Sequence, residues 1–184
     1  MLETLSPSPI TAGTWRLDPA HTSLEFRVKH IGLARVRGVF RVFEGAVVTG
    51  ADGELSGWAA IDAASLETGV AARDEHLRSP DFFAVEAHPR ITFETTAVER
   101  SGGDRLRIAG ELTIRGITRA IELDGELLGT GRDDEGNLRI GIEATGALDR
   151  RDFGLTWNTA VDGGGLLVGN RVDLRLEVSA LHVG

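Results

Sequence analysis

The most regular feature of this chain is a two-residue alternation of apolar and polar side chains. It is strict in residues 23–30, where Leu24, Phe26, Val28 and His30 alternate with polar or charged residues. The same alternation recurs further along, in residues 35–42, 91–95, 105–115, 121–127, 138–148 and 172–180. A period of two puts successive side chains on opposite faces, so each segment predicts a strand with one dry and one wet face.

Short turn sequences separate these predicted strands. Asp52-Gly53 is typical of a hairpin turn, and residues 101–104 and 133–137 are also rich in turn formers. About eight strands joined in this way predict one antiparallel sheet whose dry face needs a common interior. A closed barrel and a two-sheet sandwich both satisfy the alternation, and the length of the predicted strands favours the barrel.

The alternation stops after residue 62 and restarts at Ile91. Residues 63–78 have near-helical spacing of apolar positions and end before Pro80, which predicts a short helix. Phe82 and Phe83 follow in an extended segment. We interpret this region as a helix that closes one end of the barrel, with the two phenylalanines facing an apolar interior.

Length and composition narrow the class of protein. The 184 residues are typical of one domain, which we expect to span residues 14–184 behind a loose arm at residues 1–13. The chain has no cysteine, which removes structural disulfides and thiolate metal sites. A formal net charge of -8 disfavours nucleic acid and anionic membranes as partners. With no membrane-span-length apolar run and no secretory signal, we expect a cytoplasmic protein.

The dry-face side chains either line a tunnel or fill a solid core. The large residues concerned are Phe26, Val28, Phe40, Phe82, Phe83, Phe93 and Trp157. Small barrels are usually filled by side chains, which favours the solid core. Inward positions occupied by small residues favour the tunnel, because missing side chains leave room; these are Gly38, Gly110, Gly125, Ala144 and Gly146.

Polar residues offer few candidates for chemistry. The histidines have no metal-ligand spacing, so structural roles are favoured, although His30 has the parity of the dry face. The run from Asp149 to Asp152 can bind an anionic head group through its arginines or brace a loop by a local charge pair. No serine has the context of a hydrolase nucleophile, and the glycine run at 163–165 is typical of a hairpin rather than a phosphate loop.

Several ordered motifs resemble one known family. They lie at residues 15–23, 28–30, 37–40, 76–83, 88–93, 110–118, 149–155 and 168–172. On these motifs nearly the whole chain resembles the YceI-like family, also called the polyisoprenoid-binding family. The resemblance implies an all-β fold, an extended lipocalin-like eight-stranded antiparallel barrel, whose apolar interior binds an isoprenoid or similar lipid tail. It also implies a dimer and no catalysis.

The leading hypothesis is therefore a non-enzymatic carrier of an isoprenoid-tailed lipid, of the quinone or polyprenyl phosphate type. The expected ligand-binding residues are Phe26, Val28, His30, Gly38, Phe40, Phe82, Phe83, Phe93 and Trp157. No cofactor other than the lipid is expected, and the expected protein partner is a second copy of the chain. Two alternatives remain: a small-molecule enzyme that uses His30 with carboxylates, and a structural or stress-related interaction module with a solid core.

Overall fold

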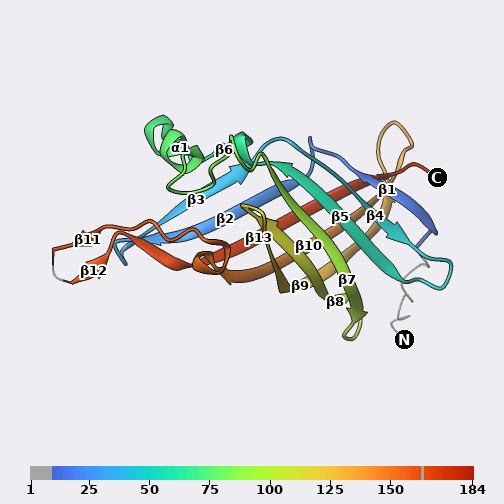
Figure 1. Ribbon diagram of the computed structural model, residues 1–184. Coiled ribbons are helices and arrows are strands. Elements are labelled where there is room, and N and C mark those ends of the chain that lie inside the picture. The colour runs from blue at the N-terminus through green and yellow to red at the C-terminus, as the bar shows by residue number, and fades with distance from the viewer. Residues whose placement is uncertain (1–9, 163) are drawn as a thin grey trace.

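The computed structural model describes residues 10–162 and 164–184, and strands dominate it (Figure 1). The strands are β1 (Gly13–Leu17), β2 (Ser23–His30), β3 (Ala34–Phe40), β4 (Phe43–Thr49), β5 (Leu55–Asp62), β6 (Leu66–Glu67), β7 (Arg90–Arg100), β8 (Arg105–Ile114), β9 (Ile117–Arg132), β10 (Leu138–Asp149), β11 (Ala160–Val161), β12 (Gly165–Leu166) and β13 (Val168–His182). The helices are α1 (Ala71–Arg78) and two 3-10 turns, η1 (Ala63–Ser65) and η2 (Arg150–Phe153).

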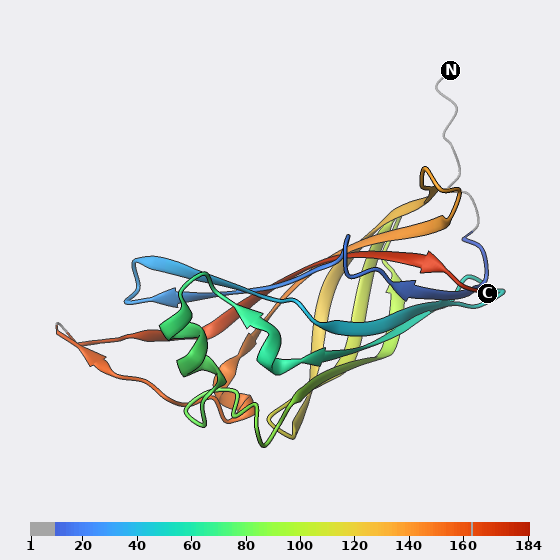
Figure 2. The same ribbon diagram turned by 90° about the horizontal axis from the view of Figure 1, so that it is seen from above.

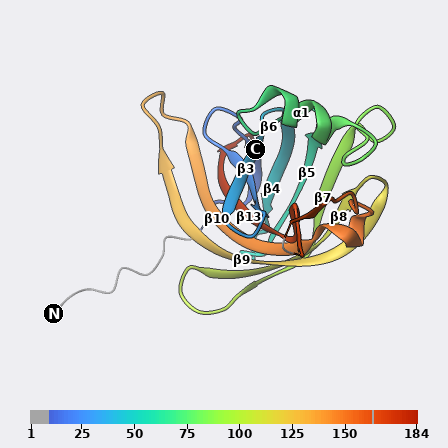
Figure 3. The same ribbon diagram turned by 90° about the vertical axis from the view of Figure 1, so that its left-hand side faces the viewer.

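Eight of the described strands close into an antiparallel barrel, which confirms the predicted fold class. Their order around the ring is β1-β4-β5-β7-β8-β9-β10-β13, and pairing of β1 with β13 closes it. The closing register pairs Trp15 with His182 and Leu17 with Ala180. Figure 3 looks along this barrel, with the curved wall of β7 to β10 opposite α1.

β13 is long enough to pair with two strands in succession. Its carboxyl end pairs with β1, while its earlier residues pair with β2 up to Glu177, which faces Ser23. Between β1 and β2 the chain leaves the sheet. Where it returns, the Thr22 hydroxyl donates a hydrogen bond to the Ser179 carbonyl at 3.0 Å and so holds the chain against β13. β2, β3 and β6 therefore extend the wall beyond the closed ring (Figure 2).

The predicted helix over 63–78 is wrong in its first half. The structure divides this segment into η1, β6 and the shorter helix α1. The Asp62 carboxylate accepts from the Ala64 N–H at 2.9 Å and so caps η1. Leu66 then pairs with Phe40 in the sheet and is fully buried, and Gly69 turns the chain at a φ of 83° before the helix begins. Burial of Leu66 in a strand thus overrides the helical spacing.

The barrel interior is solid at one end. Trp15, Ile140 and Ala180 are at most 1% exposed there, and the Trp15 indole N–H donates to the Thr49 hydroxyl at 3.0 Å. Ile10 packs against this cluster, next to the start of β1, while the predicted arm at residues 1–9 lies outside the described residues. We call this the filled end, and the opposite end, which holds α1, the helix end.

No helix in the described part of the chain has both the length and the apolar character that crossing a bilayer requires.

Candidate functional site: an apolar cavity at the helix end

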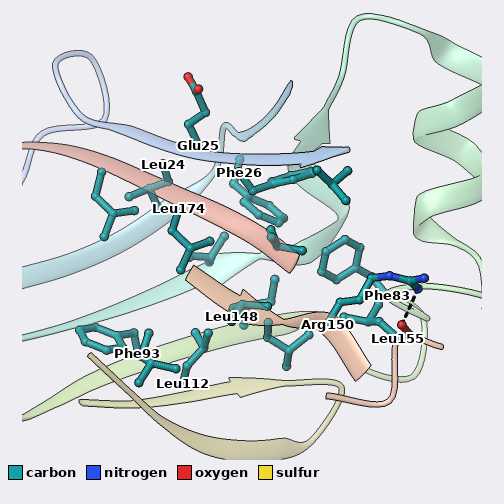
Figure 4. A pocket seen from close by; sticks show the side chains of 18 of the residues that line it. Leu24, Glu25, Phe26, Phe83, Phe93, Leu112, Leu148, Arg150, Leu155 and Leu174 are labelled. Atoms are coloured by element: carbon teal, nitrogen blue, oxygen red, sulfur yellow. Dashed lines mark hydrogen bonds between the residues drawn. The ribbon is translucent and has the colours of Figure 1, made fainter. Parts of the chain in front are cut away.

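A cavity of about 180 Å³ lies inside the barrel toward the helix end. Its wall is built from strands on all sides and is completed by α1, the loop after α1 and the segment after η2. Leucine and phenylalanine side chains converge on it in Figure 4, among them Leu24, Phe26, Phe83, Phe93, Leu112, Leu148 and Leu174. Because successive side chains of a strand point to opposite faces, the outer face of these strands carries the polar residues that contact solvent.

Six of the nine predicted ligand-binding residues line this cavity. They are Phe26, Val28, Phe40, Phe82, Phe83 and Phe93. Phe40 lies between two others, with its ring centroid 5.6 Å from Phe26 and 5.9 Å from Phe83, so aromatic rings form a continuous section of wall. Both members of the predicted phenylalanine pair face inward from the loop after α1, as their sequence context indicates.

The other three predicted residues lie outside the lining. His30 is the last residue of β2, where it pairs with Ala34 of β3 on one side and with Val168 of β13 on the other. Trp157 forms a second layer behind Phe82, at a ring distance of 5.3 Å, and stacks edge-on against His76 at 4.6 Å. Gly38 is buried, yet the Phe26 ring lies directly on it, so the cavity is bounded by the ring and not by the glycine.

The inward glycines do not leave the open space that the sequence indicated. A Cβ atom at Gly38 would lie 2.2 Å from the Phe26 ring, and one at Gly110 would lie 2.5 Å from the Phe93 ring. A leucine of the neighbouring strand similarly occupies the space over Gly146, where Leu123 would come within 2.5 Å. Each glycine thus allows a large side chain of the next strand to lie flat on the sheet, and the cavity begins beyond those side chains.

Several lining residues were not predicted, although their pattern was available. Leu112, Leu148 and Leu174 all have dry-face parity in their strands, but the prediction favoured aromatic residues. Arg150 also lines the cavity, two residues after Leu148 and hence on the same face. The signal that would have found Arg150 is the parity of an arginine at the end of an otherwise apolar inward row.

Arg150 is a buried cation held by neutral oxygen atoms. It is 4% exposed and donates from Nε to the Gly169 carbonyl at 2.9 Å, and from Nη1 to the carbonyls of Leu155 at 2.6 Å and Trp157 at 2.9 Å. Its Nη2 has longer contacts with the Val168 carbonyl and the Asn170 side chain, at 3.4 and 3.3 Å. Burial lowers the pKa of Arg150 from its ordinary value. The residue therefore clamps the segment after η2 to the start of β13 across one side of the cavity.

The neighbouring charges in the Asp149 to Asp152 run brace the loop, which is one of the two roles predicted for them. The Asp149 carboxylate accepts from the Arg151 guanidinium, with Nη2 at 2.6 Å, and from the Arg151 backbone N–H at 2.9 Å. These hydrogen bonds lower the pKa of Asp149 to about 2. Asp149 and Arg151 are thus paired with each other on the outside, while Arg150 alone turns inward.

Glu25 lies in the wall but presents its carboxylate to the outside (Figure 4). Arg27 and Arg37 both donate to this carboxylate. Burial opposes ionisation of Glu25, but the hydrogen bonds from Arg37 and Arg27 outweigh it and lower the pKa. The Glu25 carboxylate therefore has its hydrogen-bond donors outside the barrel and presents no charge to the interior of the cavity.

Histidine and carboxylate side chains do not gather at the cavity. His76 contacts the Asp81 carboxylate at 2.9 Å and His21 contacts Asp18 at 2.7 Å, both at the surface. Within the described residues no group of three or more histidine, aspartate or glutamate side chains could hold a metal ion. The enzyme alternative rested on His30, which does not reach the cavity wall.

Comparisons with known proteins agree with this architecture. Residues 15–180 match the YceI-like domain. The UPF0312 protein SA2479 of Staphylococcus aureus strain N315 is 35% identical over 170 residues, which cover 89% of this chain and 93% of the relative.

Solved structures are also similar. The YceI protein of Campylobacter jejuni has a TM-score of 0.73 at 27% identity, covering 85% of this chain and 90% of that one. BcnA of Burkholderia cenocepacia has a TM-score of 0.78 at 20% identity over 89% and 99% of the two chains. A polyisoprenoid-binding domain from Saccharophagus degradans has a TM-score of 0.72 at 14% identity over 94% and 100%. From the match over residues 15–180 and the barrel that those residues form, the chain belongs to the YceI-like family.

Proposed function

We propose that this protein binds the apolar tail of an isoprenoid-tailed or similar amphiphilic lipid in the cavity at the helix end, and sequesters or carries it without catalysis. The observation that carries the proposal is the lining itself. Side-chain carbon from strands all around the barrel faces the cavity, and the charged groups in the wall, Arg150 and Glu25, are engaged by other partners. Such a surface gains free energy by excluding water and by contact with hydrocarbon.

The expected energy favours a ligand with a long tail. Each buried methylene contributes about 0.8 kcal/mol, so a five-carbon isoprene unit contributes up to roughly 4 kcal/mol before the costs of ordering the tail. A few units are enough for tight binding, and affinity should rise with tail length. A quinone or a polyprenyl phosphate has this design, with one polar head and a tail of repeated apolar units.

A similar fold with such a ligand class supports the proposal. The domain from Saccharophagus degradans is described as polyisoprenoid-binding, and it covers 94% of this chain in the structural comparison. At 14% identity that likeness concerns the fold, and the apolar lining of this chain is what favours a lipid tail as its ligand.

A tail longer than the cavity has one side of the wall through which it can extend. The strands are held by continuous hydrogen-bonded ladders, whereas Leu77 and Phe83 come from α1 and its following loop. Displacing those two side chains breaks no strand pairing. We therefore expect the segment of α1 to adapt to tails of different length while the barrel keeps its shape.

The proposal is tested by a substitution that fills the cavity, followed by a measurement of whether the co-purified lipid, called the passenger below, is lost. Ala59 lies in the cavity wall on β5, and Ala60, the next residue, points to the opposite face of the strand. Ala59→Phe should fill the cavity, and Ala60→Phe adds the same bulk outside. Each protein is purified without detergent and analysed by native mass spectrometry and solvent extraction, before and after incubation with a polyprenol.

The wild type and Ala60→Phe should retain an apolar passenger or take up the polyprenol, and Ala59→Phe should do neither while unfolding cooperatively. Repeated absence of a passenger from the wild type, together with no uptake of added polyprenol, would contradict the proposal. Equal uptake by Ala59→Phe would place the ligand elsewhere. The predicted homodimer is checked in the same preparations by light scattering.

A further inference from the structure

Two hairpins project from the helix end of the barrel and carry exposed apolar side chains. The β2–β3 turn exposes Ile31 by 40% and Leu33 by 88%, and Leu166, in the β11–β12 hairpin, is 52% exposed. A backbone hydrogen bond of 2.8 Å from the Ile31 N–H to the Leu167 carbonyl joins the two hairpins. Both extend beyond α1 in the same direction (Figure 2). We call Ile31, Leu33 and Leu166 the apolar tip.

The turn at the tip holds a β-branched residue in a left-handed backbone conformation. Ile31 has a φ of 47° and Gly32 a φ of 70°, so both central residues of the turn are left-handed. Turns of this kind favour Asn-Gly, and a β-branched residue at positive φ is costly. An isoleucine at this position, with the exposed Leu33 directly after Gly32, indicates a role for the apolar side chains beyond turn formation.

Basic side chains of β2 and β3 lie next to the tip in a protein that is otherwise acidic. Residues 26–43 contain five lysines and arginines and no acidic residue. The whole chain has 20 basic and 28 acidic residues, so the remainder has 15 basic and 28 acidic residues. Arg27 and Arg37 contact Glu25, and Arg41 contacts Glu67. Lys29 and Arg35, which pair across the hairpin, have no ion-pair partner within the described residues. The β2–β3 hairpin therefore presents two unpaired cations beside its apolar side chains, while the β11–β12 hairpin carries one exposed acidic residue, Asp162.

The tip also lies close along the chain to two residues of the cavity wall. Val28 and Val168 line the cavity, and each lies within three residues of the apolar tip on its own segment of chain. His30 pairs with Val168, one residue before the turn. A surface that contacts the tip is therefore adjacent to the end of the barrel where the cavity lies.

From these observations we infer that the apolar tip docks on an anionic lipid membrane, with Ile31, Leu33 and Leu166 entering the interface and Lys29 and Arg35 contacting acidic head groups. Three apolar side chains are too few for a stable protein–protein interface, which needs about 1,000 Å², but they suit shallow insertion into a bilayer. The overall charge of -8 opposes binding to acidic lipid, so docking depends on this local cluster.

The test measures binding to vesicles of phosphatidylcholine with equal phosphatidylglycerol, and to vesicles of phosphatidylcholine alone, by cosedimentation. The wild type should bind the anionic vesicles in about 0.1 M salt and dissociate in about 1 M salt, where the screening length falls to about 3 Å. Leu33→Ser should weaken binding about tenfold. Replacing both Lys29 and Arg35 by glutamine should weaken it about 25-fold, at about fivefold for each cation.

A matched control is Leu128→Ser, which removes another exposed leucine, 58% exposed, from β9. Its binding should equal that of the wild type. Since the chain has no cysteine, a single cysteine at Leu33 or at Leu128 can also carry an environment-sensitive fluorophore. The label at 33 should shift to the blue on anionic vesicles, and the label at 128 should not.

Equal binding to both vesicle types, equal binding of Leu33→Ser, or an unresponsive label at 33 would overturn the inference. So would a dimer that Leu33→Ser dissociates in the absence of vesicle binding, because the tip would then be covered by a second copy. The inference rests on the proposed lipid-binding function, but cosedimentation needs no passenger in the cavity. Failure to dock would leave the mass-spectrometric result intact, and loss of the passenger would leave docking measurable.

Discussion

The contact between Gly38 and Phe26 offers a strict test of how the cavity wall is built. In Gly38→Ala, the new Cβ would lie 2.2 Å from Cζ of the Phe26 ring and 2.5 Å from its Cε1. Ordinary contact between carbon atoms begins near 3.5 Å, so the ring has to move by about 1 Å or more. The ring lies between the glycine and the cavity, so its natural displacement is into the cavity.

The magnitude follows from two opposing effects. Overpacking costs about 1–3 kcal/mol, and replacing glycine by alanine returns about 0.4–1 kcal/mol through the unfolded chain. We expect Gly38→Ala to lose about 1–2 kcal/mol of unfolding free energy, which lowers the melting temperature by about 2–8 °C in a protein of this size. Uptake of a polyprenol should also fall, because the displaced Phe26 ring occupies part of the ligand volume.

A double-mutant cycle with Phe26→Leu isolates the contact. Shortening Phe26 removes the clash, so Gly38→Ala should be nearly neutral in that background, with a coupling free energy of at least about 1 kcal/mol measured by urea unfolding. Gly131→Ala is the control, since a Cβ there meets nothing within 4 Å and the residue also lies in a strand. Coupling below about 0.5 kcal/mol, or a Gly38→Ala protein as stable as the wild type, would refute this account of the wall.

Two further predictions concern charged groups. Arg150→Met keeps the bulk of the side chain but leaves the carbonyls of the clamp without donors. At about 1 kcal/mol for each of the three short hydrogen bonds, the free energy of unfolding measured in urea should fall by about 3 kcal/mol. An unchanged urea midpoint would show that the clamp contributes nothing to stability. Arg139 contacts Asp18 at 2.7 Å and Asp133 at 2.8 Å. The pKa of each carboxyl is lowered from 3.8 to about 2, and the hydrogen bond from Arg139 is the largest cause, with smaller contributions from His21 at Asp18 and from Asn137 at Asp133. Because these pKa values are lower in the folded state, their stabilisation is complete above about pH 5 and is lost as the pH falls from about 4 to about 2. Melting curves of Arg139→Met should therefore depend less on pH in that range, and an identical slope would contradict the assignment.

The sequence predicts the barrel better than it predicts the cavity. Strand alternation is a local property, so residues 23–30 correspond to β2 without adjustment. Leu66 shows the limit, because its pairing with Phe40 depends on a segment 26 residues earlier, and its own spacing indicated a helix. Tertiary pairing overrides local spacing at such positions.

The cavity depends on which side chain lies over which neighbour, and that is set by register between strands. Gly38 and Phe26 face each other across β2 and β3, and this pairing decides that the ring covers the glycine. Parity alone placed both residues inward and could not rank them. Arg150 has inward parity too, but its partners come from the segment after η2 and from β13, and their convergence appears only in the folded chain.

The filled end of the barrel gives the cavity a direction. Trp15, Ile140 and Ala180 are buried there and belong to one hydrophobic cluster that fills this end of the described barrel. If the proposed lipid binds, its tail would therefore enter and leave at the helix end, and its head would remain on that side. A donor and an acceptor of such a lipid would then have to use that end one after the other, so the proposed delivery would be an exchange at one end of the barrel and not a transfer from one end to the other.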